Sequence, residues 1–342
     1  MKSDVLAVAT AERLRFDRFG PAHVEAAANL LLARIEELRA DVPCLPSPAG
    51  HRLDDLLRGA AVHGVGVAAV ENDRLAGYLV GLGVDGLRGP RTAAYVPEWS
   101  WAVSADAPPD LFTHLYESVA SGWVGRGWLR HLVTALPLGG PIDRQLSWLG
   151  FAPCVLDAVR DLGEPMNRQE PDAVEIAAAT DADLRQLAEL RDLLDDHLGA
   201  SPTFLHRDTS SAAGTVAGWL HDTDDRVFVA RAGLEVVAFV RLAAEGDGVA
   251  EIVGGPEVVH VVAACTRPEW RSRGVAEALL ASALSDARER GYRVAAVDFE
   301  TANPLARRFW TRFFNPVCVS YERQLDARLA PVDHDAAWEG NR

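Results

Sequence analysis

The chain has 342 residues, of which 49% are hydrophobic and 24% charged, and its formal net charge is −15. This composition is typical of a globular protein of about two domains. The negative charge argues against a nucleic-acid partner and is compatible with a cationic substrate. No apolar run approaches the ~20 residues of a membrane-spanning helix, and the first ten residues lack the pattern of a signal peptide, so we expect a cytoplasmic protein that does not bind membranes.

Cysteine and histidine spacing predicts neither disulfides nor a metal site. Cys44, Cys154, Cys265 and Cys318 lie far apart in the sequence and form no C-x-x-C pair, so we expect buried free thiols. The ten histidines form no ligand-spaced cluster, and no metal is expected.

The first half begins with a predicted helix between residues 23 and 39. The pattern then predicts, in order, a hairpin of 66–70 with 75–80, a strand over 99–103, a helix over 109–120, a strand over 129–136 and a short helix that ends at Leu149. Residues Gly81-Leu-Gly83-Val-Asp-Gly86 have the G-x-G-x-x-G spacing of a dinucleotide-binding loop. Such a loop must open a helix, which Leu87-Arg-Gly-Pro90 cannot continue, so we expect a flexible hairpin loop instead.

A polar stretch with two prolines, residues 163–173, has the composition of a linker and suggests domains at 1–163 and 174–329. The second half repeats the order of the first. Its predicted elements are a strand at 174–177, a helix at 181–197, a helix that ends near Leu220, a hairpin of 227–230 with 236–240, a strand at 258–264, a helix at 274–290, a strand at 294–299, a helix at 303–314 and a strand at 317–321.

An internal echo supports duplication. Phe151-Ala-Pro153 corresponds to Phe314-Asn-Pro316, and in both copies an Arg follows the Phe by nine residues, at Arg160 and Arg323. The period is far longer than that of a solenoid repeat, so we expect two related domains.

The segment from Ala264 to Leu280 carries the clearest chemical signal. A strand ends before a proline, a short basic loop with Gly274 follows, and a helix begins. Backbone N–H groups that converge at a helix N-terminus bind diphosphates well, and Arg271 and Arg273 can add charge-assisted hydrogen bonds. The alternative is an ordinary strand–loop–helix connection with a solvated basic loop.

Two segments of the second half resemble motifs of the GNAT (Gcn5-related N-acetyltransferase) superfamily. Arg271, Gly274 and Ala276 match the fixed positions of motif A, (Q/R)-x-x-G-x-(G/A). Asn303-Pro-Leu-Ala-Arg-Arg-Phe309-Trp310-Thr-Arg-Phe-Phe314 resembles motif B, N-x-x-A-x-x-(F/Y)-(Y/F)-x-x-x-G-F, with Phe313 in place of the glycine. The resemblance implies an α/β (α+β) fold of two GNAT-like domains, each a mixed, mostly antiparallel sheet flanked by helices.

The resemblance also implies which residues bind an acyl-CoA. The strand end, Ala264, Cys265 and Thr266, would offer backbone groups to the pantetheine arm and the thioester carbonyl. The pyrophosphate would be held by Arg271, Ser272, Arg273, Gly274, Val275, Ala276 and Glu277. Asn303, Phe309 and Trp310 would lie beside the cofactor. Asn303 can equally be a helix cap before Pro304, and Phe309 equally a core aromatic residue.

Transfer to an amine requires a proton acceptor, because a free alkylamine has a pKa of about 10. Asp298 and Glu300 share a face of the predicted fifth strand, and His260 lies on the fourth; these three are the candidate catalytic residues. Alternatively, the two acids are rim charges and His260 is a sheet residue. Trp310 stands where many family members have the Tyr that protonates the leaving thiolate, and an indole cannot deliver a proton. Tyr321 is a possible substitute.

The first half lacks motif A, since Ser104-Ala-Asp-Ala-Pro-Pro109 has neither Arg nor Gly after its strand. We therefore expect one competent C-terminal domain and one degenerate copy. The expected activity is direct acetyl transfer from acetyl-CoA, the acyl donor, to an amine of a small molecule or peptide, by a monomer or homodimer. The alternatives are a non-catalytic acyl-CoA-binding regulatory module and a transferase of a longer acyl group.

Overall fold

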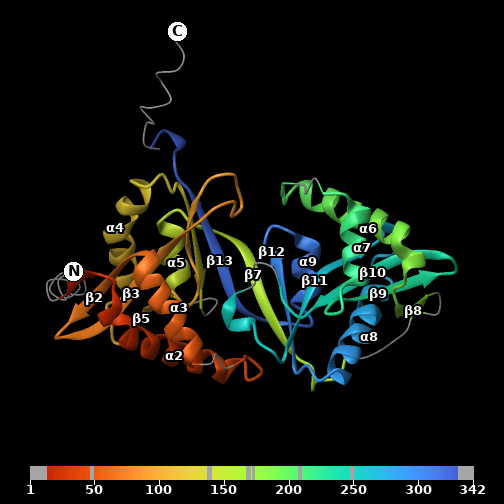
Figure 1. Cartoon of the computed structure of the whole chain (residues 1–342), viewed down its shortest axis with the longest axis horizontal. Coiled ribbons are helices and arrows are strands. Elements are labelled where there is room, and N and C mark those ends of the chain that lie inside the picture. The colour runs from red at the N-terminus through yellow and green to blue at the C-terminus, as the bar shows by residue number, and fades with distance from the viewer. Residues whose placement is uncertain are drawn as a thin grey trace, which may run out of the picture. The chain divides into compact units, whose positions relative to one another are not determined.

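The computed structural model describes residues 14–46, 50–136, 141–166, 171, 174–206, 210–246 and 250–329. The chain forms two compact units, drawn in Figure 1. Unit 1 combines Met1–Pro43, Ser47–Cys154 and Cys318–Arg342, and unit 2 combines Cys44–Pro46 and Val155–Val317. In the described ranges, no helix has both the length and the apolar character needed to cross a membrane.

Unit 1 is a sheet covered by helices. Its helices are α2 (Val24–Asp41), α3 (Gly50–His63), α4 (Leu111–Val124) and α5 (Pro141–Trp148). Its strands are β1 (Arg15–Arg18), β2 (Val65–Glu71), β3 (Arg74–Val84), β4 (Ala93–Val96), β5 (Trp101–Val103), β6 (Arg130–Ala135) and the larger part of β13 (Asn315–Gln324). The strand order is β1-β2-β3-β4-β6-β13, with β5 also on β3. Only β4 and β6 run parallel among the pairs described in this unit.

Unit 2 has the same plan. Its strands are β7 (Ala152–Asp161, from Val155), β8 (Glu175–Ala178), β9 (Arg226–Ala232), β10 (Glu235–Ala243), β11 (Val258–Thr266) and β12 (Val294–Glu300). Its helices are α6 (Leu184–Gly199), α7 (Ala212–His221), α8 (Val275–Glu289) and α9 (Pro304–Trp310). The order is β7-β12-β11-β10-β9-β8, with β11 and β12 parallel.

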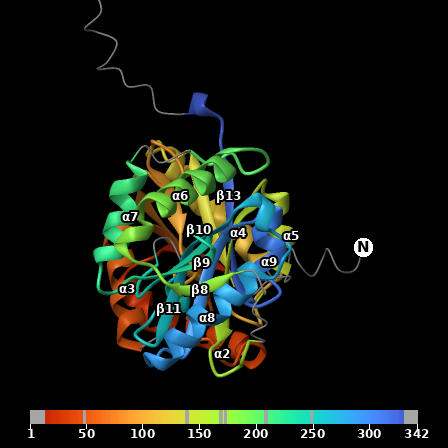
Figure 2. The same cartoon turned by 90° about the vertical axis from the view of Figure 1, so that its right-hand side faces the viewer.

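Two hydrophobic clusters cover the two faces of the unit 2 sheet. One packs α8 and α9 on residues such as Val259, Val261 and Val297, and the other packs α6 and α7 on Val229 and Phe239. The alternation of strand side chains explains this division, because neighbouring residues point to opposite faces. Figures 1 and 2 show α6 and α7 on one side of β8–β11 and α8 on the other.

Each unit receives its last strand from the other half of the chain. The strand β7, which follows Phe151, pairs antiparallel with β12, and β13, which follows Phe314, pairs antiparallel with β6. Both are ten residues long. The echo seen in the sequence therefore marks the beginning of two exchanged strands.

The registers of the exchanged strands agree. Just beyond β7, the N–H of Leu162 donates to the carbonyl of Arg293 at 2.9 Å, and just beyond β13, the N–H of Leu325 donates to the carbonyl of Leu129 at 2.8 Å. Leu162 and Leu325 each follow their phenylalanine by eleven residues. This agreement supports a duplication, although the units differ from the proposed domains 1–163 and 174–329 by the exchanged strands.

The loop predicted at Gly81–Gly86 was wrong for its first half, because Gly81 and Gly83 lie within β3. A Cβ atom at Gly81 would collide with the ring of Trp123, and one at Gly83 with the ring of Trp128. The glycines are therefore explained by two indole rings that pack directly on the strand, and not by a need for loop flexibility.

Several other elements differ from the sequence-based expectation. The strand predicted at 99–103 is the shorter β5, and β1, α3 and β4 were not predicted. The helix predicted at 303–314 ends at Trp310, where Phe313 and Phe314 both donate to its carbonyl and close a turn. All four cysteines are free thiols, as expected, although Cys44 is only half-buried.

Candidate functional site

The site predicted from the sequence lies where β11 and β12 part. Their parallel pairing covers Val258–Val261 and Val294–Val297, and β11 then continues beside β10 to Thr266. A register shift between Arg241 and Leu242 of β10 leaves Val262 as an extra residue on β11. A bulge bends and twists its strand. Within the described residues, β11 therefore has no strand partner on its β12 side beyond Val261.

The side chains at the end of β11 pack into the protein. Ala264 packs on the α8 side of the sheet and Cys265 on the α6 side. A ligand in the split would thus meet backbone groups of these residues more than their side chains. Burial raises the pKa of Cys265 to about 11, although Arg271 and Arg267 oppose the shift. Its sulfur therefore remains a thiol at neutral pH and is a poor nucleophile.

The loop after β11 presents an open helix N-terminus. Ser272 has φ of 59° and Gly274 has φ of 79°, and both backbones are in the left-handed region. Gly274 is the N-cap of α8, and no side chain in the described chain caps this helix. The first N–H groups of α8, from Val275 onward, thus have no side-chain cap among the described residues and lie at the positive end of the helix dipole, an arrangement suited to a diphosphate.

Three charged side chains lie near the N-terminus of α8: Arg271, Arg273 and Glu277. The Nε atom of Arg271 donates to the carbonyl of Thr266 at 3.1 Å, which holds this side chain against the strand end. The guanidinium of Arg273 lies over the ring of Trp270, 5.1 Å from its centroid. Glu277, in the first turn of α8, is ion-paired with Arg312 at 3.2 Å. That pairing reduces the repulsion that Glu277 would exert on an anion.

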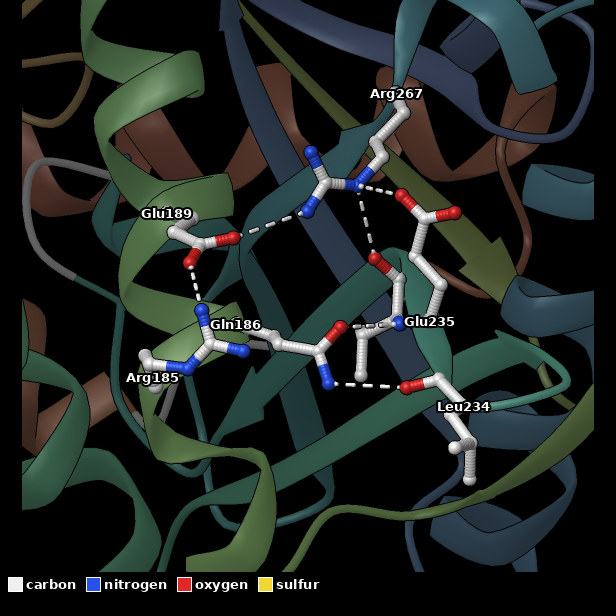
Figure 3. A network of polar contacts seen from close by, with 7 residues as sticks. Arg185, Gln186, Glu189, Leu234, Glu235 and Arg267 are labelled. Carbon is white, nitrogen blue, oxygen red and sulfur yellow. Dashed lines mark hydrogen bonds and ion pairs between the residues drawn. The ribbon is translucent and has the colours of Figure 1, made fainter.

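The side chain of Arg267 is held by hydrogen bonds and ion pairs within unit 2. Figure 3 shows it between α6 and the β9–β10 hairpin, where it donates to the carbonyl of Val236 and is ion-paired with Glu189 at 3.3 Å and Glu235 at 3.2 Å. Gln186 of α6 also hydrogen-bonds the hairpin, through the carbonyl of Leu234 and the N–H of Val236. These bonds fix the residue from which the loop between β11 and α8 starts.

Motif B forms the short helix α9. Asn303 is 6% exposed, and its Oδ1 accepts from the N–H groups of Leu305 and Ala306, both at 3.2 Å, so it is the helix cap. Phe309 is partly buried against the α8-side core, and Trp310 is 8% exposed inside it. Two members of the proposed cofactor-contact set are thus core aromatic residues.

The three candidate proton acceptors lie on the sheet face away from α8. Val297 and Phe299 of β12 belong to the α8-side core, so Asp298 and Glu300, which alternate with them, point to the other face and are half-buried. His260 shares that face but lies in the paired part of β11, opposite Ala296, and is 3% exposed. Its Nδ1 has no hydrogen-bond partner in the described structure, and burial lowers its pKa, so the ring is neutral.

The structure adds two residues that the sequence did not indicate. Asp157 of β7 lies directly opposite Asp298 of β12, is 1% exposed, and accepts from the N–H of Ala250 at 3.1 Å. His197, near the end of α6, has its Nε2 3.4 Å from Oδ1 of Asn303. Asp157 could have been placed opposite Asp298 only by knowing which strand pairs with β12, and His197 belongs to no motif.

The corresponding place in unit 1 is closed. There β4 and β6 run parallel, and Pro97–Ser100 interrupts the strand before β5 continues along β3. The indole N–H of Trp101 on β5 donates to the carbonyl of Thr134 on β6 at 2.7 Å and bridges the two strands. Tyr321 lies in this unit and donates to Asp143 at 2.8 Å, so it is bound to a partner within unit 1.

Comparison with known proteins gives one family. Residues 189–315 match the model of the acetyltransferase (GNAT) family. No curated protein sequence matches the chain. A GCN5-related N-acetyltransferase from Sphaerobacter thermophilus is similar in structure, with a TM-score of 0.59, 15% identity and coverage of 93% of this chain and 96% of that one.

Two further structures are similar over most of this chain. One is a fungal multi-domain β-N-acetylglucosaminidase with a glucosamine N-acetyltransferase region, with a TM-score of 0.51, 13% identity and coverage of 90% of this chain and 37% of that one. The other is a tandem GNAT protein from the clavulanic acid biosynthesis pathway, with a TM-score of 0.45, 14% identity and coverage of 94% and 100%. Residues 189–315, which contain both motifs, thus match the GNAT family model, and the fold of a GCN5-related N-acetyltransferase recurs over nearly the whole chain.

Proposed function

We propose that the protein transfers an acetyl group from acetyl-CoA to an amine of a small molecule or peptide. The observation that carries the proposal is the uncapped N-terminus of α8 beside the unpaired edge of β11. One holds a diphosphate and the other an extended amide chain, and acyl-CoA contains both. Acyl transfer is the activity of the family.

In this proposal the donor is held mainly by backbone groups. The N–H groups from Ser272 to Glu277 surround the pyrophosphate, and Arg271 and Arg273 add charge. The end of β11, from Ala264 to Thr266, hydrogen-bonds the pantetheine arm, and one N–H group there polarises the thioester carbonyl. Because Cys265 remains protonated, the acyl group passes directly from sulfur to the amine nitrogen.

The acceptor side is acidic. An amine substrate arrives as an ammonium ion at neutral pH and must lose a proton before it attacks. Asp298 and Glu300 are better placed to meet that cation than His260, because they lie beyond the last residue of β12 that pairs with β11 and are half-buried, whereas His260 is enclosed in the sheet. The acceptor is therefore proposed to enter over this face.

One observation favours a second candidate function. Trp310 is buried in the core at the position of the proton-donating tyrosine, which suits a regulatory module that binds acyl-CoA without turnover. Acetyl transfer remains the better-supported function, because a CoA thiol has an ordinary thiol acidity and its thiolate can leave without a proton donor.

The deciding experiment follows free CoA release from acetyl-CoA in the presence of a panel of amines and peptides. We expect at least one acceptor to raise release clearly above hydrolysis in the wild-type chain and not in Gly274→Glu. Gly218→Glu is the matched control, because Gly218 is exposed on α7 with open space around it. Tight acetyl-CoA binding with no acceptor-dependent release would establish the binding module instead.

A further inference from the structure

His197 lies between two elements of the proposed site. It is half-buried in the last turn of α6, the helix that packs on β10 and β11. Its Nε2 is 3.4 Å from Oδ1 of Asn303, which begins α9 directly after β12. The imidazole therefore lies beside the residue that follows the split strands, on the side of the sheet covered by α6.

The hydrogen bonds around Asn303 define the proton positions on the His197 ring. One side-chain atom of Asn303 accepts from the N–H groups of Leu305 and Ala306, so that atom must be the oxygen and not the amide nitrogen. An amide oxygen only accepts, so Nε2 of His197 must carry a proton. In the neutral ring the lone pair is then on Nδ1. Protonation of Nδ1 leaves the bond to Asn303 intact, and the ring keeps one position in both charge states.

We propose that His197 is a catalytic residue of the transfer reaction and accepts the proton of the amine at Nδ1. This inference rests on the proposed acetyltransferase function. The amine nitrogen forms a bond to the thioester carbon, one of its protons passes to Nδ1, and the C–S bond breaks as the tetrahedral intermediate collapses. The imidazolium then returns the proton to the CoA thiolate. A histidine in this place thus supplies both proton transfers and makes a tyrosine at position 310 unnecessary.

The roles of the carboxylates follow from this assignment. Asp298 and Glu300 bind the ammonium form of the acceptor, which gives its first proton to solvent water before it attacks, and His197 takes the second proton as the bond to the thioester carbon forms. Histidine ordinarily exchanges a proton between pH 5 and 8, as a general base at neutral pH requires. The other ionisable groups on the surrounding elements are Arg185, Glu189, Arg191, Asp192, Asp195 and Asp196 on α6, His221 on α7, Glu235 and Arg241 on β10, His260 on β11, Asp298 and Glu300 on β12, and Arg307 and Arg308 on α9.

The test compares His197→Ala and His197→Gln with His221→Gln, which changes an exposed histidine of α7. With an acceptor found by CoA release, we expect His197→Ala to lower kcat by about 10²–10⁴-fold with the acetyl-CoA dissociation constant changed less than about threefold. Added imidazole should restore part of the activity of His197→Ala, and the acidic limb of the kcat profile should disappear. His197→Gln, which keeps a donor to Asn303, should fold normally and be equally slow.

The failures of the two proposals are distinguishable. A kcat for both His197 variants within about threefold of the wild type, or a kcat loss without imidazole rescue and with an unchanged pH profile, would overturn the role of His197 and leave the acetyltransferase function standing. A large kcat loss in Asp298→Asn or Glu300→Gln, with no such loss in the His197 variants, would also overturn the role of His197. A wild-type chain that binds acetyl-CoA and releases no CoA with any amine would overturn both.

Discussion

Gly274 is the residue on which the donor site depends most. Its φ of 79° favours glycine, and among the described residues a Cβ there would meet only Pro171, at 3.8 Å, so the main restriction on this position is its backbone conformation. Gly274→Ala should cost about 1–2 kcal/mol in this backbone region and weaken acetyl-CoA binding moderately. Gly274→Glu should weaken it by roughly 100-fold or more, about 2.7 kcal/mol, because a carboxylate would face the diphosphate. Calorimetry on both variants checks this, and equal affinities for Gly274→Glu and wild type would remove the phosphate site from this loop.

Trp310 should matter for stability and not for proton transfer. It packs against Phe309 and Phe314 in the core, with ring centroids 4.9 and 5.6 Å away. Trp310→Phe leaves a partly filled cavity, so we expect a stability loss of about 1–2 kcal/mol and a kcat within a few-fold of wild type. Denaturant unfolding and steady-state kinetics measure the two effects. A kcat loss of the size expected for His197→Ala would instead give this residue a part in the chemistry.

His131 should make unit 1 sensitive to mild acid. Nε2 donates to the carbonyl of Trp128, so Nδ1 accepts from the Tyr116 hydroxyl, which in turn accepts from Arg323. Burial lowers the pKa of His131 to about 4; the Trp128 bond opposes this shift and Arg323 adds to it. The unfolded chain takes up the proton near pH 6.5, so it binds more protons than the folded chain between these values.

Stability should therefore fall as the pH drops from about 6.5 to about 4, with His131 contributing about 3 kcal/mol to the loss. His131→Gln cannot be protonated and should show a smaller loss over this window, while the exposed His63→Gln should behave as wild type. Denaturant unfolding at several pH values, followed by hydrogen exchange at β6, makes the comparison. Equal pH dependence in His131→Gln and wild type would contradict the expectation.

Among the elements, β7 lies in the first half of the sequence but mostly in unit 2, and β13 lies in the second half but mostly in unit 1. Val159 of β7 is 0% exposed and lies in unit 2, and Val319 of β13 is 4% exposed and lies in unit 1. A buried unpaired carboxylate costs several kcal/mol. Val159→Asp should therefore expose β12 to hydrogen exchange and weaken acetyl-CoA binding, although Val159 lies in the first half of the sequence. Val319→Asp should expose β6 and leave acetyl-CoA affinity nearly intact. The opposite pattern would mean that the strands are not exchanged.

Local patterns predicted most elements, and motif spacing predicted the donor loop. Helices α2, α6 and α8 and the two hairpins follow from periodicity and turn residues, which act over short distances. The exchange of β7 and β13 could not be predicted in this way, because both strands are apolar at their third, fourth, fifth and seventh residues and nothing local says which pairs with β6 and which with β12. For the same reason the sequence did not indicate that Asp157 lies opposite Asp298. His197 and Asn303 are 106 residues apart in the sequence, and only the folded structure shows that they are in contact.

For the whole molecule, we expect one acetyl-CoA per chain. Unit 1 has a Trp101 indole between β5 and β6, and the segment that follows β5 carries Asp106 and no basic residue before α4. Both features disfavour an anionic ligand. Isothermal titration should give a stoichiometry of one, and Gly274→Glu should weaken this single binding event by roughly 100-fold or more. A stoichiometry of two, or residual binding beside Ser104–Pro109 in that variant, would show that the first domain kept a site.

The exchange also constrains how the chain can fold as it leaves the ribosome. The partner of β6 is β13, so Thr134 must await Ser320 before its sheet is closed. Unit 1 therefore presents an unpaired strand edge during the synthesis of nearly all of unit 2, and such edges promote aggregation. The long separation between the paired residues also predicts slow folding. The nascent first half thus depends on β13 to cover its exposed strand edge. Neither half of the sequence contains all the strands of its own unit, so we expect neither half to fold properly when it is expressed alone.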